Sequence, residues 1–184
     1  MGMDEDILAV ETRRNIYRFV RERPGFHLRE IARSLTLSIT LVDYHLRFLE
    51  KHELVSASMD GEYKRYYPRS LPGDQDAHPA LTDQQKQILA YLRQPVPLRV
   101  VNFLMEREWS THKEILDHVS VSPSTLSHHL RKMLSARIVT RGEMRDRGYR
   151  VLDPKSVARL MTTYELATAD QIDMWLRVWG EFRL

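Results

Sequence analysis

The sequence contains an internal repeat with an offset of 84 residues. Ten residues recur without a gap across 40 aligned positions, and many of the remaining pairs keep their apolar character. The identical pairs are Phe19/Phe103, Glu22/Glu106, Arg23/Arg107, Glu30/Glu114, Ile31/Ile115, Ser38/Ser122, His45/His129, Leu46/Leu130, Arg47/Arg131 and Val55/Val139. Because self-similarity at a fixed offset identifies the unit from which a fold is built, the chain is predicted to fold as two copies of one small module.

Each copy has the pattern of three helices followed by a hairpin. In the first copy, apolar residues at 16–20 precede the helix-ending Pro24, and residues 28–35 carry a second apolar stripe at helical spacing. Ser38 and Ser122 stand where a third helix should begin, and each can accept a backbone N–H bond as an N-cap. The third helices then bury one aliphatic edge, which consists of Val42, Leu46 and Leu49 in the first copy and Leu126, Leu130 and Met133 in the second.

After each third helix the apolar spacing shortens towards two, which indicates a β-hairpin at 54–67 and another at 138–151. A segment rich in Pro, Gly and Asp separates the copies, and Thr82 with Gln85 forms a capping box for an additional helix. The predicted fold is mainly α with small β-hairpin wings. Its expected parts are a first module at 1–68, a linker at 69–81, a second module with an extra N-terminal helix at 82–153, and a C-terminal helical tail at 154–184.

The C-terminal tail carries an apolar stripe at helical spacing that must be buried against something. The stripe consists of Ile172, Trp175, Leu176 and Trp179, after a cap formed by Thr168 and Gln171. A helix with this pattern serves as core or as a dimer interface more often than as the wall of a ligand pocket. We therefore expect a homodimer through these amphipathic helices.

Two strings of the repeat, LSITLVDYHLRFLEKHELV (37–55) and VSPSTLSHHLRKMLSARIV (121–139), resemble the helix-turn-helix core of ArsR- and MarR-like winged-helix regulators. With the preceding helices and the hairpins, the resemblance covers about three quarters of the chain, and two adjacent copies look like the tandem winged-helix regulators common in archaea. The resemblance implies a third helix that enters the major groove of DNA and a hairpin wing that contacts the backbone or the minor groove.

In the second module we expect groove contacts from the helix face opposite the aliphatic edge, and phosphate contacts from the wing. The helix residues are Ser124, Ser127, His128 and Arg131, and the wing residues are Arg141, Arg145, Arg147 and Arg150. In the first module the corresponding residues are Thr40, Tyr44 and Arg47 on the helix, with Lys64 and Arg65 on the wing. Packing of Tyr44 against the wing aromatics is an alternative for that residue.

The first module departs from the family pattern at Asp43, which occupies a position that commonly carries a small hydroxyl residue. A carboxylate facing phosphates weakens binding unless it accepts from a cytosine amino group. Charge is also uneven, because residues 1–70 hold 12 Lys+Arg against 11 Asp+Glu and residues 82–152 hold 12 against 7. The second module is therefore expected to dominate DNA binding.

Several classes of function are disfavoured. The chain has no cysteine, which excludes disulfides and thiolate metal sites, and His45, His128 and His129 lack companions at ligand spacing. No nucleophile motif, Gly-rich phosphate loop or carboxylate pair is present, so we expect no enzyme, no cofactor and no metal. No apolar run is long enough for a membrane span, and the N-terminus lacks a signal-peptide pattern, which favours a cytoplasmic, nucleoid-associated protein.

The predicted function is regulation of transcription through double-stranded DNA, with an effector that the sequence does not identify. An architectural chromosome protein is one alternative, disfavoured because the net charge is only +3. A winged-helix protein-interaction scaffold is the other, since a fold does not determine its function.

Overall fold

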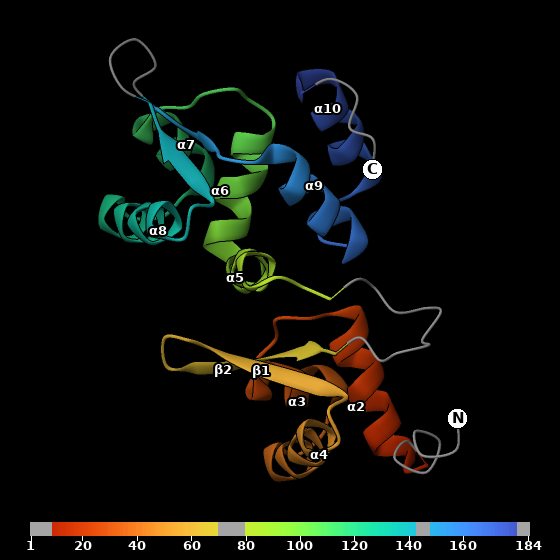
Figure 1. The fold of residues 1–184 in the computed structure, drawn as a ribbon. Helices are drawn as coiled ribbons and strands as arrows, with labels where there is room; N and C mark the ends of the chain where they lie inside the picture. Colours follow the sequence, from red (N-terminus) through yellow and green to blue (C-terminus); the bar gives the residue numbers. More distant parts are fainter. Residues whose placement is uncertain (1–8, 70–79, 143–147, 180–184) are drawn as a thin grey trace. The chain divides into compact units, whose positions relative to one another are not determined.

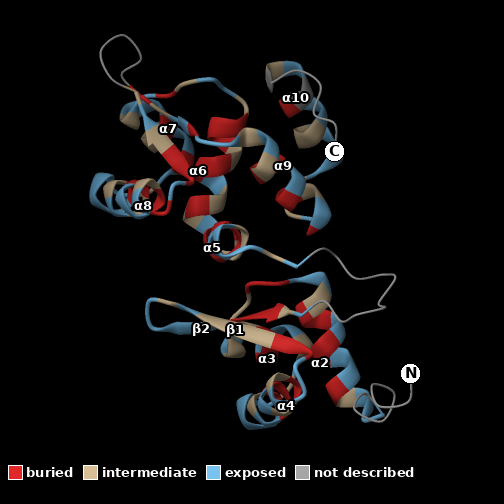
Figure 2. Ribbon diagram, in the orientation of Figure 1, coloured by how far each residue is buried: buried red, intermediate tan, exposed pale blue. Residues whose placement is uncertain are grey.

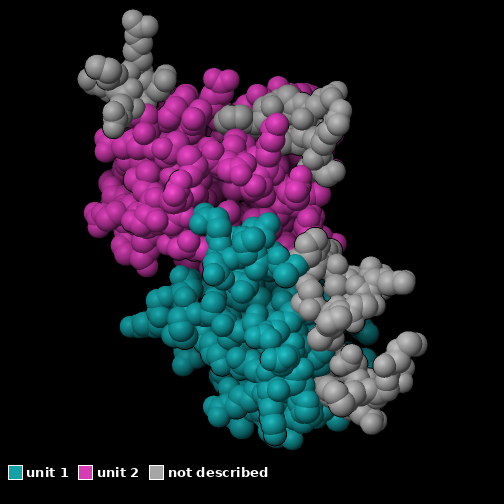
Figure 3. All heavy atoms as spheres, in the orientation of Figure 1, with its two compact units in different colours: residues 1–86 teal, residues 87–184 magenta. Residues whose placement is uncertain are grey.

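The structure, a computed structural model, describes residues 9–69, 80–142 and 148–179 (Figure 1). The chain divides into two compact units, residues 1–86 and residues 87–184 (Figure 3). Unit 1 contains α2 (Glu11–Glu22), α3 (Leu28–Leu35), α4 (Ile39–Lys51), β1 (Val55–Asp60) and β2 (Tyr63–Pro68). The unit boundary falls within α5 (Asp83–Leu92), and unit 2 continues with α6 (Pro95–Met105), α7 (His112–Val119), α8 (Pro123–Ser135), β3 (Val139–Arg141), β4 (Tyr149–Val151), α9 (Pro154–Thr163) and α10 (Ala169–Trp179). The mainly helical fold with two small hairpins is confirmed.

The repeat in the sequence is also a repeat in the backbone. An offset of 84 residues carries the bounds of α3 onto those of α7, and the bounds of α4 onto those of α8. The same offset relates the left-handed residues that end these helices: Thr36 (φ 54°) corresponds to Ser120 (φ 52°), and Glu53 (φ 60°) to Arg137 (φ 54°). Because left-handed backbone is uncommon outside glycine, its recurrence at equivalent positions shows that both units make the same turns.

Each unit is built around the aliphatic edge of the third helix of its repeat, which is α4 in unit 1 and α8 in unit 2 (Figure 2). The predicted edge residues are buried in both copies: Val42, Leu46 and Leu49 in α4, and Leu126, Leu130 and Met133 in α8, are each between 0% and 2% exposed. Helix α4 contacts α2 and α3, and α8 contacts α6. Burial of such a side chain stabilises a fold by about 1.5 to 3 kcal/mol, so this edge sets the position of the whole helix.

Side-chain caps define where the helices begin. The Oγ atoms of Ser38 and Ser122 accept from the backbone N–H three residues later, at 3.2 Å and 3.1 Å, as the sequence predicts. Thr111 forms a reciprocal capping box with Glu114 at the start of α7. The equivalent box in unit 1 uses His27, whose Nδ1 accepts from the backbone N–H of Glu30 at 3.4 Å.

The two hairpins are antiparallel and differ in length. Strands β1 and β2 pair from Val55↔Pro68 to Asp60↔Tyr63, whereas β3 and β4 pair from Val139↔Val151 to Arg141↔Tyr149. Each second strand also bridges the loop before the helix-turn-helix, through Arg65 with His27 and Tyr149 with Ser110. At Gly148 an added Cβ would lie 2.7 Å from the carbonyl oxygen of Ser110, so this close approach requires glycine.

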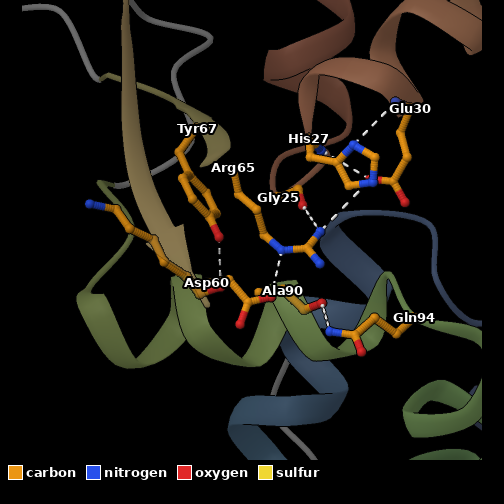
Figure 4. Close-up of polar contacts among 9 residues, drawn as sticks. Gly25, His27, Glu30, Asp60, Arg65, Tyr67, Ala90 and Gln94 are labelled. Atoms are coloured by element: carbon orange, nitrogen blue, oxygen red, sulfur yellow. Dashed lines mark hydrogen bonds and ion pairs between the residues drawn. The ribbon is translucent and has the colours of Figure 1, made fainter. Parts of the chain in front are cut away.

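The wing of unit 1 is held by a buried arginine (Figure 4). Arg65 is 3% exposed; its Nε donates to Asp60 and its Nη1 to the carbonyl oxygen of Gly25, both at 2.8 Å. The carboxylate of Glu30 lies 3.8 Å from the same Nη1, and the ring of Tyr63 stacks on His27 at 5.0 Å. Arg65 therefore joins the hairpin tip to the residues that precede α3.

The C-terminal helices belong to unit 2. Helix α10 contacts α9 and α6, and Trp175 is 1% exposed. Within the ranges that the structure describes, no helix is long and apolar enough to cross a membrane.

We predict that acidification weakens unit 1 through the His27 cap. Burial, the largest cause, lowers the pKa of His27 below its ordinary 6.5, and Arg65, Arg29 and Arg33 act in the same direction, whereas Glu30 raises it. A histidine whose folded pKa is lowered contributes stability above the unfolded value of 6.5, and this is lost as the pH falls, because protonated Nδ1 cannot accept a hydrogen bond. The urea midpoint should fall between pH 7.5 and pH 5.5, and this fall should be smaller in His27→Ser than in the unaltered chain, because serine caps the helix without titrating. An equal fall in the two proteins would contradict the role assigned to His27.

We also predict that Arg65 is a structural residue. Arg65→Met removes the guanidinium from Asp60 and Gly25 and should lower the free energy of unfolding of unit 1 by about 2 to 4 kcal/mol. The control is Lys64→Met, which breaks an exposed pair with Glu50 and should cost less than about 1 kcal/mol. Urea denaturation measures both, and similar losses in the two variants would show that the guanidinium contacts contribute little.

Candidate nucleic-acid interface

The outer face of α8 in unit 2 is polar and accessible. Ser124, His128 and Arg131 are exposed, Ser127 is half-buried, and all four lie away from the buried edge of the helix. Figure 2 shows this outer face largely in the colour of exposed residues. The helix start is ordered by hydroxyl contacts, since Ser122 Oγ lies 2.9 Å from Ser124 Oγ and 2.7 Å from Thr125 Oγ1. The arrangement presents hydroxyl, imidazole and guanidinium groups, which suit the edges of bases.

A residue that sequence reasoning missed contacts this face. His112, the first residue of α7, places its Nε2 3.0 Å from the Oγ of Ser127. Ser127 is therefore held by a neighbouring helix, and His112 adjoins the polar face of α8. The pattern of α8 alone contains no signal for this contact, because it depends on the angle between α7 and α8.

The wing of unit 2 adds two exposed arginines. The guanidinium of Arg141 lies 5.8 Å from the ring centre of Tyr149, and that of Arg150 lies 4.8 Å from Trp109. Neither residue forms an ion pair within the part of the chain that the structure describes, and the same holds for Arg131 and Lys132 on α8. The other two predicted wing residues, Arg145 and Arg147, lie outside the described residues.

In unit 1 the corresponding cations are engaged within the protein. Arg47 Nε lies 2.8 Å from Asp43 Oδ2, and Lys64 Nζ lies 2.8 Å from Glu50 Oε2. Thr40 is exposed, and Tyr44 is 60% exposed, with its ring centre 5.1 Å from that of His45 in an edge-to-face arrangement. The phenol of Tyr44 is therefore accessible, whereas two of the three predicted cations carry a carboxylate partner at the surface.

One predicted contact needs correction. Arg65 was expected to bind phosphate from the wing of unit 1, but its guanidinium is buried and bonded to Asp60 and Gly25. The expectation rests on its charge and on its place in the hairpin. The approach of β2 to the loop before α3 instead covers it, and that contact is not visible in a local pattern.

The recurring histidines of the third helices are buried or half-buried. His45 Nδ1 and His129 Nδ1 have no hydrogen-bond partner among the described residues. Burial is the largest cause that lowers the pKa of each, with Arg13 adding to the effect at His45 and His128 at His129. Burial therefore favours the neutral form of both rings. No group of three His, Cys, Asp or Glu suitable for a metal ion occurs in the described ranges.

The predicted dimer stripe on α10 divides into two parts. Trp175 is buried within unit 2 and Ile172 is half-buried, so the tryptophan ring packs in its own core rather than on a free surface. The side chains of Leu176 and Trp179 lie outside what the structure describes. Among the side chains of α10 that the structure describes, Met174 is an exposed large apolar residue, at 41%.

Comparison with known proteins supports this architecture. Residues 10–76 match a family model described as an N-terminal HTH domain, and residues 94–141 match the model of bacterial regulatory proteins of the ArsR family. The chain is 27% identical over 136 residues to an uncharacterised HTH-type transcriptional regulator of Methanocaldococcus jannaschii. The aligned segment covers 74% of this chain and 32% of that protein. The chain thus aligns with about a third of the length of this relative. The first matched segment spans α2 to β2 and the second spans α6 to β3, so each falls on one of the two repeated units. The chain therefore carries two winged helix-turn-helix domains in tandem, the second of which matches the ArsR-family model.

Proposed function

We propose that the chain is a DNA-binding transcription regulator in which unit 2 provides most of the affinity. The observation that carries the proposal is the exposed polar face of α8 beside a wing with Arg141 and Arg150, all without carboxylate partners in the described ranges. Free cations displace counterions from the phosphate backbone, whereas paired ones first have to give up their partners. The ArsR-family match of this unit agrees with the assignment.

We further propose residues 1–68 and 82–153 as the two functional modules, joined through 69–81. In this arrangement the recognition helices are α4 and α8, and the wings contact the backbone or the minor groove. The proposal assigns no catalytic residue and no cofactor, since the matched families are helix-turn-helix domains. A regulator of this kind acts in the cytoplasm on the nucleoid.

A homodimer through the C-terminal helices is part of the proposal. Its support is the exposed Met174 on α10 and the half-buried Ile172 of the same helix. Two-fold symmetric dimers are the commonest assemblies of soluble proteins, and they bind two half-sites of a DNA operator. The buried Trp175 is assigned to the core of each protomer rather than to the interface.

We predict that DNA affinity depends steeply on salt and on the arginines of unit 2. With about four to six cations engaged, log affinity for a mixed-sequence duplex should fall with log salt at a slope of about −4 to −5. Arg131→Ala and Arg150→Ala should each weaken binding and reduce the slope by about 1 where the residue contacts phosphate. Arg159→Ala, an exposed arginine on α9, is the matched control.

Fluorescence anisotropy of a labelled duplex at several salt concentrations measures these slopes. Unchanged affinity in both Arg131→Ala and Arg150→Ala would contradict DNA binding by unit 2 and favour the protein-interaction scaffold. Equal affinity for every unrelated duplex in competition would favour the architectural role, because a regulator binds its site more tightly than random DNA.

We predict that Met174→Glu shifts a dimer towards monomer, since a carboxylate at an apolar contact loses hydration without gaining a partner. Arg99→Glu adds the same carboxylate at an exposed position of α6, outside the C-terminal helices, and should leave the mass unchanged. Light scattering on the intact variants is the measurement, because truncation at Pro154 would remove Trp175 from its core position. A monomeric unaltered chain would contradict the dimer.

A further inference from the structure

The third helix of unit 1 carries an ion pair that its counterpart in unit 2 does not have. Arg47 and Asp43 lie one helical turn apart on α4, with 2.8 Å between Nε and Oδ2. At the equivalent positions of α8 stand Arg131 and Ser127, and Ser127 is bonded to His112 instead. The pair lies at the surface, since the side chains of Arg47 and Asp43 are 76% and 32% exposed.

The atoms of this contact determine what the arginine can still bind. A guanidinium is a planar group with five N–H donors, one on Nε and two on each terminal nitrogen. Because Asp43 accepts from the Nε of Arg47, N–H donors on the two terminal nitrogens remain available. Recognition of guanine requires two parallel donors directed at O6 and N7, and an arginine fork supplies them.

The carboxylate has two further effects on DNA binding. It restrains a long side chain that otherwise loses several rotamers on binding, so less conformational entropy is lost when the fork meets a base. It also lies beside the phosphates when α4 enters a groove, which weakens binding to every duplex alike. Together these effects lower affinity for DNA in general and retain it where the fork finds a guanine.

Of the three predicted cations of unit 1, Arg47 is the one with an exposed guanidinium fork. Lys64 pairs with Glu50 at 2.8 Å, and Arg65 is buried with Asp60 and Gly25. Thr40, two turns before Arg47, and Tyr44 are exposed on the same helix and offer hydroxyl groups to adjoining bases.

We propose that Arg47, held by Asp43, reads a guanine in the major groove, so that unit 1 selects a G·C pair while unit 2 supplies general affinity. Asp43 is the positioning residue of this pair. The inference rests on the proposed function, because it concerns the specificity of DNA binding rather than its existence.

The test is selection of bound sequences from random DNA by the full chain, with affinity for a mixed-sequence duplex measured in parallel. Arg47→Ala should abolish the preference for guanine at one position, with discrimination falling about tenfold or more, and Arg47→Lys should restore only part of it. Asp43→Ser, which introduces the residue of unit 2, should raise affinity for the mixed-sequence duplex and lower discrimination at that position. A rise in general affinity together with a fall in discrimination indicates that Asp43 positions Arg47. Simple repulsion of phosphate by Asp43 would raise the affinity and leave the discrimination unchanged.

Three results would overturn the proposal. An unchanged base profile in Arg47→Ala, or an unchanged profile with higher affinity in Asp43→Ser, would remove the guanine assignment and leave DNA binding by unit 2 intact. Failure of the unaltered chain to bind any duplex would remove the proposed function together with this inference. Urea midpoints of the variants provide the control, since a helix-stabilising ion pair alone would shift the midpoint by a small amount and leave the base profile unchanged.

Discussion

Both units depend on burial of one aliphatic edge along the third helix. Leu46 and Leu130 lie at the centre of these edges, and each helix is held on one side while its opposite side stays exposed. The left-handed residues Thr36 and Ser120 end the preceding helix at equivalent positions, so the same turn leads into each third helix. A helix fixed in this way can present side chains to a groove and stay packed in the core, because one face is buried and the other is accessible.

The same scaffold carries different electrostatics in the two units. In unit 1 the surface cations Arg47 and Lys64 each pair with a carboxylate, and Arg65 is used to anchor the wing. In unit 2, Arg131 and Arg150 remain without a carboxylate in the described ranges. We propose that this difference leaves unit 2 suited to bind the phosphate backbone and unit 1 suited to discriminate between sequences, since paired charges add little general affinity.

Much of this architecture follows from local patterns. The helix bounds, the serine caps at Ser38 and Ser122 and the two buried edges depend on residues close in sequence, and the internal repeat supplied a second instance of each. The burial of Arg65, the contact between His112 and Ser127, and the packing of Trp175 depend on how separate elements approach one another. Local patterns describe one helix or strand at a time, so the charge of Arg65 predicts a surface position and the apolar stripe of α10 predicts a partner for Trp175.

The central claim is that the exposed face of α8 and the wing beside it contact duplex DNA. The most direct measurement is the change in backbone amide NMR shifts as a mixed-sequence duplex is added at low salt, where phosphate contacts are strongest. The account predicts the largest changes at Ser124, His128, Arg131 and Arg150, with little change along α9 and α10. Shifts confined to α9 and α10, with the α8 face unaffected, would contradict it.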